Sequence, residues 1–73
     1  MRVRYDTEVN AASISLTDKL DDLPGPVTSV PVTVPENAEG RVILDFKYGR
    51  LVGIEVLAAD ITLPDDLLAE GHP

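Results

Sequence analysis

Residues 41–57 of this 73-residue chain have the sequence RVILDFKYGRLVGIEVL, in which two alternating apolar runs flank a turn that contains glycine. An apolar residue at every second position is typical of half-buried β-strands. The segment therefore predicts a β-hairpin with one apolar face. The residues of that face are Val42, Leu44 and Phe46 in the first run, and Val52, Ile54 and Val56 in the second.

The register of this hairpin depends on the length of its turn. A two-residue turn at Tyr48-Gly49 would put Val52 on the face of Asp45. A three-residue loop at residues 47–49 instead opposes Val42 to Ile54 and Leu44 to Val52, which keeps the apolar residues together. Such loops end on a left-handed residue, a conformation that suits Gly49. We therefore expect the three-residue loop, with Arg41 opposite Glu55 on the other face.

The other face of the hairpin is not fully polar. It carries two acids inside strands, where Asp especially is disfavoured; they either face solvent and a cross-strand Arg41 or mark a specific polar contact. Because apolar side chains share this face, we expect the C-terminal segment or a second copy of the chain to cover it. The residues of this expected interface are Ile43, Asp45, Leu51, Gly53, Glu55 and Leu57, with Gly49 as the turn residue.

The remaining segments extend the sheet. Alternating runs at residues 2–5 and 11–16 predict a second hairpin. Residues 28–34 predict a strand that lies at an edge or carries a bulge, because Pro31 lacks a backbone N–H. Residues 62–71 predict a short helix that forms only by docking on the sheet. Its expected features are a capping-box spacing at Thr62 and Asp65, a shared face of Leu63, Leu67 and Leu68, and an end at Gly71.

The predicted fold is α+β and mostly β: a four- to five-stranded antiparallel sheet, ordered along the chain as hairpin, edge strand and hairpin, with a short C-terminal helix. A chain of this length forms one domain, 1–73, in which we expect residues 18–27 to be a flexible loop and residues 71–73 a frayed tail. The expected core comprises Val3, Tyr5, Ile14, Leu16, Val30, Val32, Val42, Leu44, Val52 and Ile54.

Charge and hydropathy exclude several classes of protein. The net charge is −7, with 13 acidic and 6 basic residues, so the chain lacks the basic face that nucleic-acid binders present to phosphates. No apolar run approaches the roughly 18 residues that span a bilayer, and the basic start precedes no signal-peptide core. We expect a cytoplasmic protein that binds neither nucleic acid nor membrane.

Residues for catalysis or metal binding do not form a recognisable pattern. The chain has no cysteine, and its single histidine, His72, lies one residue from the C-terminus. The acids at residues 18–22 and 60–66 match neither a calcium loop nor a desolvated acid–base pair. The serines and glycines match no nucleophile or phosphate-binding motif. We therefore expect no enzymatic activity, no cofactor and no metal.

Two segments, RYDTEVNAASISLTD at residues 4–18 and GRVILDFKYGRLVGIEVL at residues 40–57, resemble the opening and the hallmark hairpin of short prokaryotic proteins grouped as domain of unknown function 2283. Asp45, Gly49, Gly53 and Glu55 stand where that family's motif has the same residue types. The chain departs from the motif at Ser13, where an aromatic residue is common. The resemblance implies no established activity; some members are encoded beside small toxin-like proteins, which implies an antitoxin or inhibitor role.

Three classes of function remain, and the sequence does not separate the first two. The first is a non-catalytic interaction domain, such as an antitoxin-like inhibitor of a basic protein partner, with the acids at residues 18–22 and 65–66 steering the encounter. The second is a self-associating module with a structural or regulatory role. So small a core without disulfides favours a homodimer. The missing nucleophile, base and metal ligands disfavour a small enzyme or ligand-binding protein.

Overall fold

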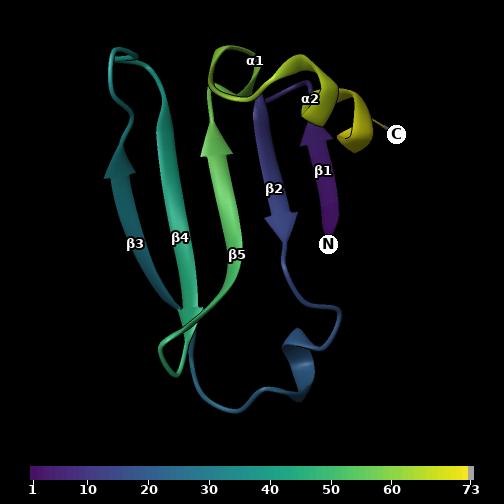
Figure 1. Ribbon diagram of the computed structural model, residues 1–73, viewed down its shortest axis with the longest axis vertical. Coiled ribbons are helices and arrows are strands. Elements are labelled where there is room, and N and C mark those ends of the chain that lie inside the picture. Colours follow the sequence, from purple (N-terminus) through teal and green to yellow (C-terminus); the bar gives the residue numbers. More distant parts are fainter. Residues whose placement is uncertain (73) are drawn as a thin grey trace.

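The computed structural model describes residues 1–72 as a five-stranded antiparallel sheet with three short helical segments (Figure 1). The order of strands across the sheet is β1-β2-β5-β4-β3. The predicted fold is therefore confirmed, including the edge position of the strand that contains Pro31. The strands are β1 (Arg2–Asp6), β2 (Ala11–Ser15), β3 (Thr28–Thr33), β4 (Arg41–Lys47) and β5 (Arg50–Leu57); the helical segments are η1 (Leu20–Asp22), α1 (Ala59–Thr62) and α2 (Asp65–Gly71).

Two hairpins, β1-β2 and β4-β5, meet along β2 and β5, and β3 then pairs with the outer side of β4. The connection from β2 to β3 runs past the end of the sheet and contains η1 (Figure 1). Lys47 anchors it, because its Nζ donates to the main-chain oxygens of Leu20 at 3.3 Å and Leu23 at 3.0 Å.

The register divides the strand residues into two chemically distinct faces. Cross-strand partners share a face, and successive residues alternate between faces. The apolar face carries Val3, Tyr5, Ala12, Ile14, Thr28, Val30, Val32, Val42, Leu44, Phe46, Leu51, Ile54 and Val56. The polar face carries every charged residue of the five strands: Arg2, Arg4, Asp6, Arg41, Asp45, Lys47, Arg50 and Glu55.

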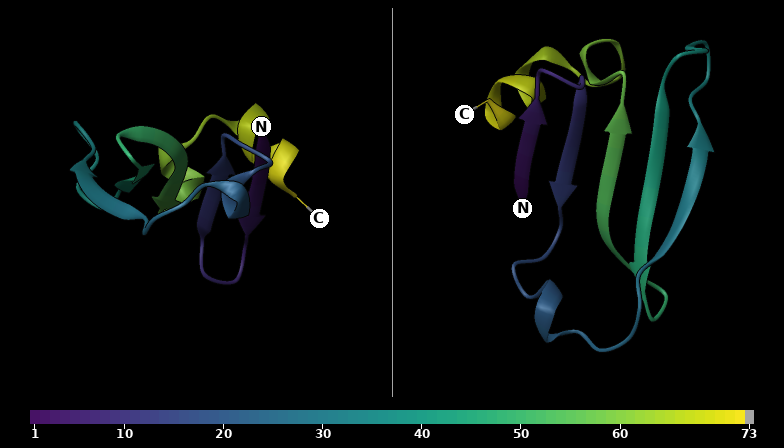
Figure 2. Two further views of the ribbon diagram at one scale, coloured as in Figure 1. Left: turned by 90° about the horizontal axis from the view of Figure 1, so that it is seen from below. Right: turned by 180° about the vertical axis from the view of Figure 1, so that it is seen from behind.

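The core forms where α1 and α2 pack on the apolar face, over β1, β2 and β5 (Figure 1, Figure 2). Val56 is 1% exposed and Ala59 fully buried. Their cluster also contains Ala12 and Leu68, with Tyr5, Ile54 and Leu63 packed against it. The helices thus cover the face opposite Ile43 and Leu57. We expected the C-terminal segment or a second copy of the chain to cover the face of Ile43 and Leu57. The first of these two arrangements is wrong, because the helices lie on the opposite face.

The expected three-residue hairpin loop is also wrong. Lys47 pairs with Arg50, which leaves a two-residue turn, Tyr48-Gly49, in which both φ angles are positive, at 49° and 74°. Phe46 pairs with Leu51, but Asp45 pairs with Gly53, so Val52 is an extra residue in β5. This β-bulge restores the alternation that a two-residue turn alone would break.

The bulge keeps most residues on their predicted faces, with Leu51 as an exception, and shifts the predicted pairs by two residues. Leu44 pairs with Ile54 and not with Val52, and Val42 pairs with Val56 and not with Ile54. Arg41 consequently lies opposite Leu57, so the expected pairing of Arg41 with Glu55 does not occur.

The predicted core is partly confirmed. Ile14 and Val52 are buried, and Val3, Tyr5, Val42, Leu44 and Ile54 are half-buried. Leu16, Val30 and Val32 are instead exposed, since the helices do not reach them. Four residues of the buried cluster are absent from the predicted core. They are Val56, Leu68 of α2, and the small residues Ala12 and Ala59, which are buried because α1 lies close to the sheet.

The sequence did not predict helix α1. Two asparagines from loops of the sheet form hydrogen bonds with it. Asn10 has a left-handed φ of 54°, and its oxygen Oδ1 accepts from the Asp60 N–H at 3.0 Å and from the Tyr5 hydroxyl at 3.2 Å. Asn37 donates from Nδ2 to the Thr62 hydroxyl at 3.1 Å. Loops at the same end of the sheet are thereby tied to α1.

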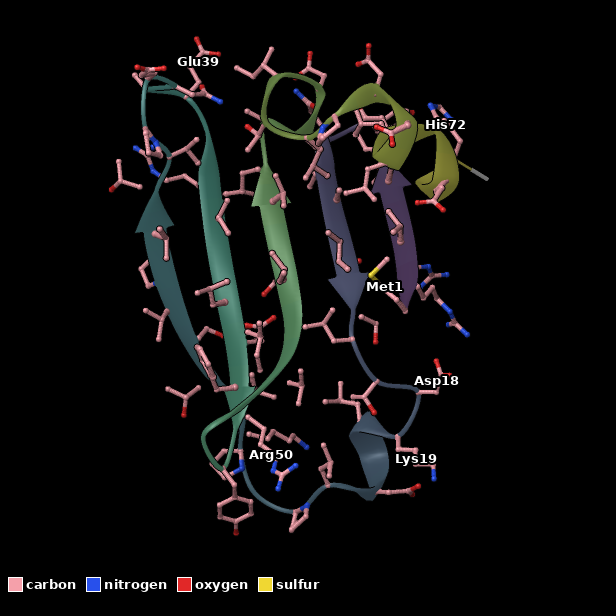
Figure 3. All side chains as sticks on the ribbon, viewed as in Figure 1. Met1, Asp18, Lys19, Glu39, Arg50 and His72 are labelled. Atoms are coloured by element: carbon pink, nitrogen blue, oxygen red, sulfur yellow. The ribbon has the colours of Figure 1, made fainter. Side chains whose placement is uncertain are left out.

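The C-terminal helix begins and ends differently from the expectation. Thr62 closes α1, donating its hydroxyl to the Ala58 oxygen at 2.8 Å, and the N-cap of α2 is Pro64 without a side-chain hydrogen bond. Gly71 is buried in α2; an added Cβ there would lie 2.9 Å from the Tyr5 nitrogen. His72 stacks edge-on against Tyr5 at 5.4 Å between ring centroids, beside β1 (Figure 3). Of the expected frayed tail, Gly71 is therefore packed, the exposed His72 contacts Tyr5, and Pro73 lies outside the described residues.

Candidate functional site: a carboxyl pair on the polar face

The two acids inside the central strands lie next to each other on the polar face. Asp45 of β4 is opposite Gly53, and Glu55 of β5 is opposite Ile43, so the two carboxyl side chains are diagonal neighbours across the β4-β5 ladder. Diagonal neighbours on one face lie within reach of long side chains. The bulge at Val52 produces this placement, because the predicted register would have set Glu55 opposite Arg41.

The carboxyl groups contact each other, and this changes the protonation of Glu55. A side-chain hydrogen bond with Asp45, followed by partial burial and by repulsion from the Asp45 charge, raises the pKa of Glu55 above its ordinary value of 4.5. Asp45 also accepts a hydrogen bond from the Ser29 hydroxyl at 2.6 Å. The Asp45 carboxyl group therefore contacts neighbours on both sides, Ser29 of β3 and Glu55 of β5.

The basic residues of β4 do not neutralise this pair. Arg41 donates from Nη1 to the main-chain oxygens of Ala38 at 3.0 Å and Gly40 at 2.8 Å. Lys47 is engaged by the carbonyls of the β2-β3 connection. Arg4 stands in the same cross-strand row as Glu55, with Ser13 between them. The pair is thus linked by a side-chain hydrogen bond, with repulsion between its members when both are ionised.

A hollow of about 340 Å³ opens over the carboxyl pair. Gly53 leaves room there because it has no side chain, and apolar groups of Leu20 and Val27 from the β2-β3 connection border the hollow. The remaining lining residues are Ser13, Ser15, Val52 and Ile54. The hollow therefore combines two acids with an apolar wall.

The other residues of the expected interface do not all lie together. Ile43, Gly53 and Leu57 share the polar face with the two acids, and Leu57 is 44% exposed. Leu51 pairs with Phe46 and so lies on the apolar face, because the bulge reverses the alternation between residues 51 and 53. Gly49 has the expected positive φ.

The acidic segments that were expected to steer a partner lie at opposite ends of the molecule. Asp18 lies with Lys19 and Arg50 at the end of the sheet away from Glu39 and the helices (Figure 3), whereas Asp65 and Asp66 are in the first turn of α2. They do not form one acidic patch with the carboxyl pair. Within residues 1–72, no three His, Cys, Asp or Glu side chains are grouped as a metal site requires.

Comparison with protein-family models matches residues 2–59 to the family described as "Protein of unknown function (DUF2283)". The chain belongs to this family. The matched range takes in all five strands and ends at the first residue of α1, so the carboxyl pair lies inside the part shared with the DUF2283 family and α2 lies beyond it. No curated protein and no solved structure gives a significant match. None of the helices in the described range is long and apolar enough to cross a membrane.

Proposed function

We propose that this DUF2283 protein is a non-catalytic interaction domain that binds a basic protein partner at the carboxyl pair. The observation that carries the proposal is the contact between Asp45 and Glu55 on an open face, without a basic residue of β4 bound to either. Two adjacent carboxylates repel each other, and a Lys or Arg side chain from a partner would remove that repulsion. The free energy released would favour the complex.

The hollow suits a basic side chain in shape as well as charge. Lys and Arg bury apolar stems and keep their charged heads at polar groups. In this proposal, Leu20 and Val27 contact the apolar stem of the partner's side chain, and the two carboxyl groups bind its charged head. Arg can engage carboxylates through two parallel hydrogen bonds, which adds geometric specificity.

The overall charge supports the same kind of partner. A net charge of −7 attracts a basic protein and speeds its encounter with the domain. An antitoxin-like inhibitor is the specific form of this proposal, in which the domain occupies the basic groove of an enzyme that acts on nucleic acid. A self-associating module without such a partner is the alternative function.

The test is affinity purification of the tagged chain from its native cells at low ionic strength, with two matched double variants. Asp45→Asn with Glu55→Gln should lose the basic partner, whereas Asp65→Asn with Asp66→Asn, which removes the same charge from α2, should retain it. The wild-type complex should weaken as salt rises, because screening acts within about 8–10 Å at physiological ionic strength. Equal loss in both variants would show that only total charge matters, and recovery of the chain alone would contradict the proposal.

A second readout reports on the site itself. Binding of a short Arg-rich peptide, used as a probe, should lower the pKa of the Glu55 carboxyl measured by NMR, because a nearby cation favours the charged form. An unchanged pKa with saturating peptide would place the contact elsewhere.

A further inference from the structure

Half of the apolar face has no covering element among the described residues. Helices α1 and α2 pack over β1, β2 and β5 at one end of the sheet, and no described helix lies over β3 or β4 (Figure 1, Figure 2). We call this region the open half; it comprises Val30, Val32, Val42, Leu44, Phe46 and Leu51. Val30 is 43% exposed, Val32 41% and Leu51 39%.

The open half is apolar and uncharged. All charged residues of the five strands project from the polar face, so the open half is uncharged. Its apolar side chains are neighbours across β3, β4 and the start of β5, with Thr28 beside Phe46. Contiguous apolar surface of this kind marks interaction sites in folded proteins. Leu20 and Val27 of the β2-β3 connection do not cover it, since they lie with the carboxyl pair over the polar face.

The total exposed area of the chain is larger than expected for a compact monomer of its mass. The chain exposes 5206 Å², whereas a folded monomer of 7.9 kDa is expected to expose about 4,400 Å². The excess is about 800 Å², which is the area that each partner buries in a standard protein–protein interface. A partner that buried this excess at the open half would form an interface of standard size.

We propose that the open half packs against the open half of a second copy of this chain, forming a two-fold homodimer of sheet on sheet. Identical apolar surfaces are self-complementary across a two-fold axis. Packing at about 10 Å between the sheets directs the polar faces of both copies outward, so their acids lie beyond screening distance from each other.

Pairing through the apolar faces is favoured over strand addition at the β3 edge, which borders the open half. Pro31 of β3 has no N–H to donate, and proline on an edge strand opposes the addition of another strand. The dimer differs from the one that the sequence suggested, which used Ile43, Leu51 and Leu57. It leaves the carboxyl pair free, so the inference does not depend on the proposed function.

Sedimentation equilibrium of the purified full chain, without any partner, tests the proposal. The wild type should have twice the mass of 7.9 kDa at about 100 µM, and its dimerisation should hold or strengthen when salt rises, because no ion pair is involved. Val32→Glu should weaken dimerisation by at least about tenfold, since each copy would bring a charge into the interface. Thr33→Glu, the same charge at the next position on the polar face, should remain dimeric.

A monomeric wild type, or loss of the dimer in Thr33→Glu with retention in Val32→Glu, would overturn the proposal. Circular dichroism shows whether Val32→Glu is folded. If it is not, isotope-filtered NMR on a mixture of labelled and unlabelled wild type identifies the residues at the interface. Intermolecular contacts from the methyl groups of Val30, Val32 and Leu44 support the open half, whereas contacts from Ile43 and Leu57 refute it. The double variant at Asp45 and Glu55 should dimerise normally, which separates this result from that of the partner experiment.

Discussion

At the scale of single residues, Tyr48 and Gly49 carry the turn that sets the register of the central hairpin. Both have positive φ, which two-residue turns need if they are to follow the twist of the strands. An added Cβ at Gly49 would meet nothing within 4 Å, so the cost of a side chain there comes from the backbone alone.

Replacing Gly49 with Val should therefore destabilise the fold by more than about 1 kcal/mol, since a β-branched residue resists the left-handed region. Gly49→Asn is the control, because Asn tolerates this conformation and should cost less. Urea denaturation of both variants measures the difference. Equal stability of Gly49→Val and wild type would mean that the turn is not held in this conformation.

Glu55 gives a pH prediction at the same scale. Its pKa is raised in the folded state, so the native protein binds more protons than the unfolded chain from about its ordinary value of 4.5 up to the raised value. The stability that depends on Glu55 is therefore complete below this window and declines as pH rises through it.

Glu55→Gln should stabilise the fold at pH 7, because the amide keeps a hydrogen bond to Asp45 and removes the repulsion. The gain should be about 0.2–1 kcal/mol, the range for cross-strand pairs, and should vanish near pH 4. Urea denaturation at the two pH values measures it, with Glu39→Gln in the exposed β3-β4 loop as the control. A similar gain in both variants would point to total charge in place of the local pair.

At the scale of elements, α2 depends on the sheet for its stability. Seven residues are too few for a helix that is stable by itself. Leu68 supplies the docking contact, since it is 8% exposed and packs in the cluster with Ala12, Val56 and Ala59.

Leu68→Ala should destabilise the protein by about 2–5 kcal/mol and should increase hydrogen exchange in α2. Leu67→Ala, one position earlier and outside the buried cluster, should have a smaller effect. If the two variants are equally stable, the helix does not dock as described. NMR exchange rates of the α2 amides separate undocking of the helix from global unfolding.

At the scale of the whole molecule, the sheet is chemically two-sided and only part of its apolar side is covered. Helices occupy one end of that side, and the open half takes up the rest. A domain of this size has little stability to spare, so burial of the open half in a dimer would contribute a large share of the total.

The thermal midpoint should therefore rise with chain concentration, by about 3–6 °C for each tenfold increase, because mass action stabilises a folded dimer. Calorimetry over a tenfold or larger concentration range measures this. The Thr33→Glu variant should show the same slope and Val32→Glu a smaller one. A concentration-independent midpoint in the wild type would argue for a monomer that melts alone.

The sequence by itself determined the strands, the faces of the sheet and the edge strand. Alternation places the apolar residues of each run on one side, except where the bulge moves Leu51, and Pro31 favours an edge position or a bulge for its strand. It also identified Asp45 and Glu55 as unusual, because acids inside central strands are disfavoured.

Only the tertiary structure decided how those elements meet. A loop of three residues and a turn of two residues with a bulge preserve the same alternation, so the local pattern could not separate them. The choice between them depends on the twist of the hairpin and on the pairing of β5 with β2. Just after β2, the Leu16 N–H donates to the Val52 oxygen at 3.0 Å. That choice shifts the pairs by two residues and brings Asp45 next to Glu55.

The same reasoning applies to the helices. The leucines of residues 63–68 indicate an apolar helix face but not the side of the sheet that it covers. Close approach decides this, since small residues at Ala12, Ala59 and Gly71 let α1 pack beside β5 and α2 beside β1. Burial of those residues depends on the distance between elements, which no periodicity in the sequence records.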